Sequence, residues 1–132
     1  NASATYAADA LRALDQILVA AEQWQRSLPS LGVNEALNVN AAVASGRVVF
    51  ATLGDGDRLE YTVIGEAVNL AAKLEKHNKV ENSLALVAGD TVALAREQGY
   101  AAASQFISRP AARVAGVTAL IDLHARVAEA VQ

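Results

Sequence analysis

Residues 62–75, TVIGEAVNLAAKLE, contain a short extended run that ends at Gly65 and continues directly into a helix. Polar side chains recur there at intervals of three and four residues, which places them on one helical face. These residues are Glu66, Asn69, Lys73 and Lys76. Lys offers a compact positive charge and Asn offers both a donor and an acceptor, so this face suits a phosphate or a ribose. The same pattern is also typical of the solvated face of a helix that packs by its apolar side.

Composition limits the possible functions. The chain has 132 residues, 53% of them hydrophobic, which predicts one domain over residues 1–132 with a modest core. A net charge of -3 argues against a nucleic-acid surface, which needs an excess of clustered Lys and Arg. The absence of cysteine excludes disulfides and thiolate metal sites. No apolar run reaches the length of a bilayer span. We therefore expect a soluble, cytoplasmic domain that contacts a membrane only through other domains, if at all.

Hydrophobic periodicity predicts a single α+β domain. The predicted helices are residues 7–26, the segment after Gly65, and residues 90–98. The predicted strands are residues 37–43, 47–53, 84–88, 102–107 and 118–124, together with the run before Gly65. A tight turn at Ser45-Gly46 is expected to join the first two strands, and a second turn is expected at residues 54–57. We expect Trp24 to pack the first helix onto the sheet.

The residue sequence around Gly65 is a more specific signal than the hydrophobic periodicity of this stretch. Residues 58–65, RLEYTVIG, and 68–75, VNLAAKLE, closely resemble the signature of class III nucleotidyl cyclases, the adenylate and guanylate cyclases. The resemblance is strongest from Ala42 to Glu75 and extends more loosely to about Leu123, so that it covers about two thirds of the chain. It implies a ferredoxin-like palm that acts as a dimer, with each active site between two catalytic domains.

The resemblance also implies a reaction, in which the ribose 3'-oxygen attacks the α-phosphate of ATP and pyrophosphate leaves. One domain supplies aspartates for Mg or Mn ions, and the other supplies purine contacts, an Asn and a basic residue. Carried over by position, Thr62 contacts the purine, Asn69 orients the ribose and Lys73 stabilises the phosphate charge. Most of the family has Arg where this chain has Lys73, which lacks the planar fork that contacts two oxygens. A Thr at position 62 is similar to bacterial and soluble adenylate cyclases and favours ATP over GTP.

The chain departs from the family in its metal ligands. Both aspartate motifs lie upstream of the long helix in the family and are not found here, so we expect a palm that lacks its first strands. Gly54-Asp55 and Gly56-Asp57 look superficially similar to one motif, but they occupy a later turn and we assign them no metal role. The family's Val-Lys-Gly aligns with Val114-Ala115-Gly116, so a charge that contacts the triphosphate is missing.

Two functions remain open. The first is an adenylate cyclase-type domain that converts ATP to cyclic AMP and pyrophosphate. In that case this chain supplies Thr62, Asn69 and Lys73 and needs an intact partner or its own missing strands for turnover. The partner that we expect is a second cyclase domain, most simply in a homodimer. The alternative is a catalytically inactive cyclase-like module for dimerisation, regulation or nucleotide binding. Lys73 and Ala115 favour the alternative, whereas residues 61–69 favour the enzyme. We expect that this polypeptide alone makes no cyclic nucleotide.

Overall fold

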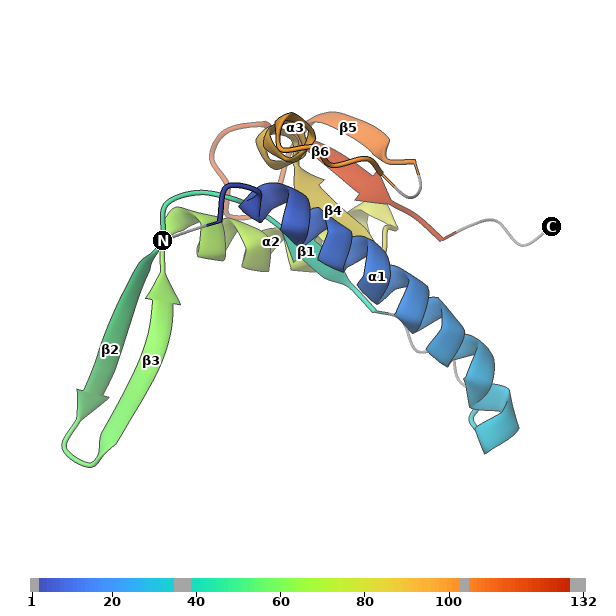
Figure 1. The fold of residues 1–132 in the computed structure, drawn as a ribbon, viewed down its shortest axis with the longest axis horizontal. Coiled ribbons are helices and arrows are strands. Elements are labelled where there is room, and N and C mark those ends of the chain that lie inside the picture. The colour runs from blue at the N-terminus through green and yellow to red at the C-terminus, as the bar shows by residue number, and fades with distance from the viewer. Residues whose placement is uncertain (1–2, 35–38, 103–104, 129–132) are drawn as a thin grey trace.

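The computed structural model describes residues 3–34, 39–102 and 105–128. Helices pack on both faces of a mixed sheet, and a separate hairpin projects from one end (Figure 1). The helices are α1 (Tyr6–Ser27), the 3-10 helix η1 (Leu28–Leu31), α2 (Glu66–Glu81) and α3 (Gly89–Glu97). The strands are β1 (Ala41–Val43), β2 (Val49–Asp55), β3 (Arg58–Ile64), β4 (Ala85–Ala88), β5 (Ile107–Ala112) and β6 (Ile121–Arg126). The predicted α+β class is confirmed.

The central sheet is four-stranded with the order β1-β4-β6-β5. β1 runs parallel to β4, whereas β6 is antiparallel to both β4 and β5. Every residue of β4 is buried, because helices cover both faces of the sheet. Ala85 and Val87 belong to one apolar cluster, and Leu86 and Ala88 belong to the other. This alternation explains why the strand is apolar throughout.

Two apolar layers hold the helices against the sheet. α1 and α3 form the first layer through residues Ala7, Ala8, Leu11, Leu14, Val92 and Ala95. α2 forms the second layer through Leu74, which packs with Leu123 and Ala125 of β6. None of the helices among the described residues is both long and apolar enough to span a bilayer.

Asn78 fastens the C-terminal end of α2 to the sheet. Its side chain is 1% exposed, and its Nδ2 donates to the carbonyl oxygen of Ala41 at 2.9 Å. Its Oδ1 accepts a hydrogen bond from the hydroxyl of Ser83 at 2.7 Å. A buried amide that is hydrogen-bonded on both sides costs little to bury and fixes the helix in one place.

β2 and β3 form an antiparallel hairpin that stands away from the sheet (Figure 1). Its register runs from Val49 opposite Ile64 to Asp55 opposite Arg58, so the turn predicted at residues 54–57 is confirmed. The turn needs glycine at two positions for different reasons. Gly56 has a positive φ of 61°, and a Cβ on Gly54 would lie 1.9 Å from the carbonyl oxygen of Arg58.

The predicted hairpin between residues 37–43 and 47–53 is wrong. β1 pairs with β4 and β2 pairs with β3, although part of the first predicted strand, residues 37 and 38, lies outside the described residues. The segment between β1 and β2 is held by α3. The Ser45 amide donates to the Thr91 hydroxyl of α3 at 3.0 Å, and the hydroxyl oxygens of Ser45 and Thr91 lie 2.8 Å apart. These contacts replace the turn expected at Ser45-Gly46.

Two further predictions need correction. The last two strands, β5 and β6, begin at Ile107 and Ile121, whereas starts at residues 102 and 118 were expected. Their positions follow from pairing, because β6 takes its register from β4 and β5 takes its register from β6. Residues 103 and 104 of the predicted fifth strand lie outside the described residues. Trp24 does not pack on the sheet and is 47% exposed. The core contacts of α1 run from Ala7 to Leu18, and the rest of the helix extends past the sheet (Figure 1).

Candidate functional site

Gly65 joins the projecting hairpin to α2 without an intervening loop. Its φ of 166° is ordinary extended backbone, so conformational strain does not explain the glycine. Close approach does, because a Cβ here would lie 2.6 Å from the carbonyl oxygen of Arg47. The base of the hairpin and the first turn of the helix are therefore held in a fixed relationship.

Thr62 and Asn69 lie on opposite sides of this junction. Thr62 is half-buried near the base of β3, where it lies opposite Ala51 of β2. Asn69 is exposed in the first turn of α2, and its backbone amide donates to the Gly65 carbonyl oxygen at 3.2 Å. Neither side chain lies in the apolar core, so both remain available to a ligand.

Lys73 lies one helical turn after Asn69 on the same face of α2. Its side chain is half-buried, and its Nζ donates to the carbonyl oxygen of Gly116 at 2.8 Å. Gly116 belongs to the segment between β5 and β6 and has a positive φ of 84°. A Cβ at this position would lie 3.0 Å from Lys73 Cε.

Gly116 was not among the predicted site residues. It follows Ala115 in the segment that resembles the Val-Lys-Gly of the family, and that match was the signal that could have identified it. The structure brings this segment against Lys73, although 43 residues separate Gly116 from Lys73 in sequence. The loop that lacks the family's lysine thus contacts the lysine on α2.

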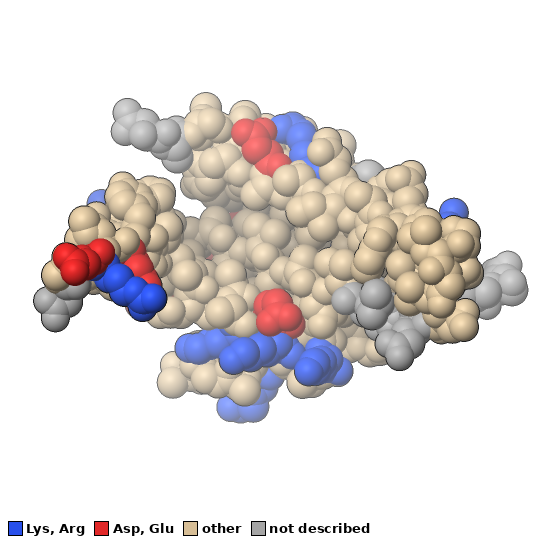
Figure 2. All heavy atoms as spheres, turned by 90° about the horizontal axis from the view of Figure 1, so that it is seen from below, with Lys and Arg blue, Asp and Glu red and all other residues tan. Residues whose placement is uncertain are grey.

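Charged side chains are unevenly distributed around this end of the molecule. Figure 2 shows charges of both signs on the hairpin and a row of Lys and Arg side chains on the body. A hollow separates the two (Figure 2). α2 itself carries basic residues at helical spacing, since Lys73, Lys76 and Lys79 follow one another at intervals of three.

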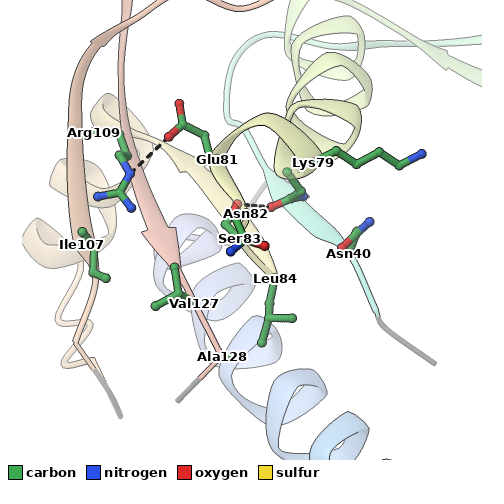
Figure 3. A pocket seen from close by; sticks show the side chains of 11 residues that line it. Asn40, Lys79, Glu81, Asn82, Ser83, Leu84, Ile107, Arg109, Val127 and Ala128 are labelled. Carbon is green, nitrogen blue, oxygen red and sulfur yellow. Dashed lines mark hydrogen bonds and ion pairs between the residues drawn. The ribbon is translucent and has the colours of Figure 1, made fainter. Parts of the chain in front are cut away.

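Two cavities lie away from the predicted site residues. A mostly apolar cavity of about 380 Å³ adjoins α1 and α2, and its lining includes Ala67 and Ala71. A larger cavity of about 600 Å³, lined by both polar and apolar residues, lies at the other end of α2, where Arg109 Nε donates to Glu81 Oε2 at 3.1 Å (Figure 3). Neither cavity is lined by Thr62, Asn69 or Lys73.

The described residues do not fit the metal ions that the resemblance implies. Mg²⁺ and Mn²⁺ need several oxygen ligands close together. No group of three or more His, Cys, Asp or Glu side chains in residues 3–34, 39–102 and 105–128 is arranged to hold a metal ion. We therefore assign the described residues no chemistry that passes through a metal.

Solved structures of known proteins share the fold. The adenylyl cyclase CyaB from P. aeruginosa is similar over 92% of this chain and 60% of its own, with 19% identity and a TM-score of 0.67. The guanylyl cyclase Cya2 is similar over 92% of this chain and 60% of its own, with 21% identity and a TM-score of 0.63. No family model and no curated protein matches the sequence.

The likeness covers almost all of this chain but only about 60% of either solved structure. It confirms the expected cyclase-type fold as a partial one. The sequence identity is low, so the likeness concerns the fold alone. The fold of this chain therefore corresponds to part of the fold seen in these adenylyl and guanylyl cyclase structures.

Proposed function

We propose that this chain supplies the purine- and phosphate-binding half of a nucleotidyl cyclase site and that the nucleotide is ATP. The observation that carries the proposal is the placement of Asn69 and Lys73 on one accessible face of α2, with the Lys73 ammonium held at 2.8 Å from Gly116. A held cation next to an exposed carboxamide suits a phosphorylated sugar.

Each side chain has a role that matches its chemistry. The hydroxyl of Thr62 both donates and accepts, so it can contact an adenine edge. The carboxamide of Asn69 orients the ribose through its hydroxyls. The Lys73 ammonium has three donors, of which the Gly116 carbonyl uses one, and the others can face phosphate oxygens as negative charge builds up.

The hairpin supports an association with a second cyclase domain, most simply a second copy. Large apolar side chains project from both of its faces, although a two-stranded hairpin alone is marginally stable in water. Phe50 is 65% exposed and Tyr61 is 77% exposed, with ring centroids 6.3 Å apart. An exposed apolar surface of this kind marks a contact with another protein.

ATP binding tests the proposal directly. The 132-residue chain is titrated with ATP and with GTP in the presence of Mg²⁺ or Mn²⁺, and the affinities are compared by calorimetry. We expect tighter binding of ATP, and a loss of about tenfold or more for Lys73→Gln, because a charged contact to phosphate is worth roughly 1.5–3 kcal/mol. Lys76→Gln is the matched control on the same helix. Equal losses in the two variants would mean that only the general charge of α2 attracts the nucleotide.

Turnover is tested with a partner. The chain is mixed with a nucleotidyl cyclase domain that retains its metal aspartates but has lost its own Asn and basic residue. Cyclic AMP formed only in the mixture supports the half-site role, and Asn69→Ala should then lower turnover far more than ATP affinity. Cyclic AMP made by the 132-residue chain alone would contradict the expectation that it needs a second domain.

A second candidate is a cyclase-like module that dimerises but does not turn over nucleotide. The exposed apolar hairpin favours it, since this surface serves association whether or not ATP is bound. Self-association without measurable ATP affinity would select this candidate. Affinity that depends on Thr62 and Lys73 would select the first.

A further inference from the structure

The loop between β5 and β6 holds the cation of the proposed site. The Lys73 stem lies against Gly116, because a Cβ there would meet Lys73 Cε at 3.0 Å, Cδ at 3.4 Å and Nζ at 3.6 Å. The Gly116 carbonyl oxygen accepts a hydrogen bond from Lys73 Nζ at 2.8 Å. A Cβ at residue 116 would therefore require the end of the Lys73 side chain to shift by a few tenths of an ångström.

We infer that Gly116 is a positioning residue for Lys73, which it fixes in place for the triphosphate of the nucleotide. The inference rests on the proposed function. Lysine has a long, flexible stem, and much of its cost of binding is the conformational freedom that it loses. A lysine already held by a backbone carbonyl loses less freedom when phosphate arrives. The contact thus compensates in part for the absence of the planar guanidinium fork.

Two features favour glycine at position 116. Its φ of 84° lies in the left-handed region, which directs its carbonyl in a way that other residues adopt with strain. The space next to its Cα is also filled by Lys73. Gly32 offers a matched comparison, because its φ of 81° imposes the same strain but a Cβ there would meet no atom within 4 Å.

Labelling of the amines tests the contact without a nucleotide. The lysines of the 132-residue chain are reductively methylated with ¹³C-formaldehyde and followed by NMR, with Lys73 assigned from Lys73→Arg. In the wild-type chain Lys73 should react more slowly than the exposed Lys76. Gly116→Ala should bring the two rates together, whereas Gly32→Ala should leave the difference intact. Equal rates in the wild-type chain would overturn the inference.

Nucleotide binding tests the purpose of the contact. Gly116→Ala should weaken ATP binding by about 10- to 30-fold at most, the range that freezing one long side chain is worth. Gly32→Ala should leave the affinity unchanged. In a Lys73→Met background Gly116→Ala should have no further effect, because it acts through the missing ammonium. An equal loss in both backgrounds would overturn the inference and leave a structural role for Gly116.

The outcomes separate this inference from the proposed function. If the wild-type chain binds ATP and Gly116→Ala changes labelling but not affinity, the inference fails and the proposed function stands. If the wild-type chain binds no ATP, the proposed function fails and the inference falls with it, even where the labelling rates differ. If Gly116→Ala does not fold, the wild-type Lys73 ¹⁵Nζ protons decide, since they should exchange with water more slowly than those of Lys76. Equal exchange would again overturn the inference.

Discussion

Arg126 and Asp15 form an ion pair of 2.8 Å that joins β6 to α1. Their side chains are only 5% and 11% exposed, so the pair is screened little by water. The Tyr100 hydroxyl donates to the other carboxylate oxygen of Asp15 at 2.8 Å and accepts from Arg126 Nη2 at 3.0 Å. The Arg126 guanidinium also lies 4.0 Å from the centroid of the Phe106 ring. This network fastens the buried half of α1 to the sheet.

Replacement of Asp15 should therefore destabilise the domain. Asp15→Ala leaves the Arg126 charge buried without its carboxylate, and breaking a buried pair in this way costs about 3–5 kcal/mol. Urea unfolding followed by circular dichroism measures the change. Glu22→Ala is the control, because it breaks the exposed pair with Arg26 and should cost less than about 1 kcal/mol. Equal losses would show that the buried network contributes nothing beyond a surface pair.

Tyr100 should make the fold sensitive to alkali. Burial is the main cause that raises the pKa of Tyr100 from 10.0 to about 12, and the hydrogen bond to Asp15 adds to it. The folded state thus holds the phenol proton more tightly than the unfolded chain does. Its contribution to stability is complete below pH 10.0 and is lost as the pH rises toward about 12. The unfolding free energy should fall more steeply over this window in the wild-type chain than in Tyr100→Phe, and parallel curves would contradict the assignment.

Gly65→Ala should disturb both stability and the proposed site. The new Cβ would lie 2.6 Å from the Arg47 carbonyl oxygen, so the hairpin base and the first turn of α2 must separate. Such overpacking costs about 1–3 kcal/mol and should also weaken ATP binding, since Thr62 and Asn69 lie on either side of the junction. Gly46→Ala serves as the control, because its Cβ would meet only the Ala67 methyl at 3.2 Å. Calorimetry and thermal unfolding of both variants measure the effects.

Tyr61→Ala should weaken self-association if a second copy covers the hairpin. A central aromatic residue in an interface is typically worth about 2 kcal/mol or more. Sedimentation velocity over a range of concentrations measures the dissociation constant. Trp24→Ala is the control, since Trp24 is also an exposed aromatic residue but lies on the far half of α1. A larger effect of Trp24→Ala would move the interface to that helix.

The sequence predicted the elements better than their pairing. The helices have clear periodicity, and α1, α2 and α3 lie close to where the sequence places them. Strand pairing depends on distant contacts, so the turn expected at Ser45-Gly46 was overridden by the hydrogen bonds to Thr91. Trp24 was misplaced for a similar reason. Periodicity marks the apolar face of α1 but does not indicate where along its length the sheet ends.

The relative placement of the predicted site residues could be read from the sequence where it is local and not where it is distant. Asn69 and Lys73 share a face because helical spacing dictates it, and the structure keeps both outside the apolar core. The contact between Lys73 and Gly116 joins residues 43 positions apart, and neither residue type indicates in the sequence that the other is its partner. The Arg126–Asp15 pair spans 111 positions and was likewise invisible in the sequence.

The two ends of α2 are held very differently. The C-terminal end is locked to the sheet through Asn78, whereas the N-terminal end continues through Gly65 into a hairpin that stands clear of the body (Figure 1). The C-terminal half of α2 is therefore anchored in the domain interior, whereas its first turn is packed through Gly65 against the base of the hairpin. If the proposed function holds, a partner that binds the hairpin contacts the same packed unit that carries Asn69, so binding of the partner and the placement of that residue would be linked.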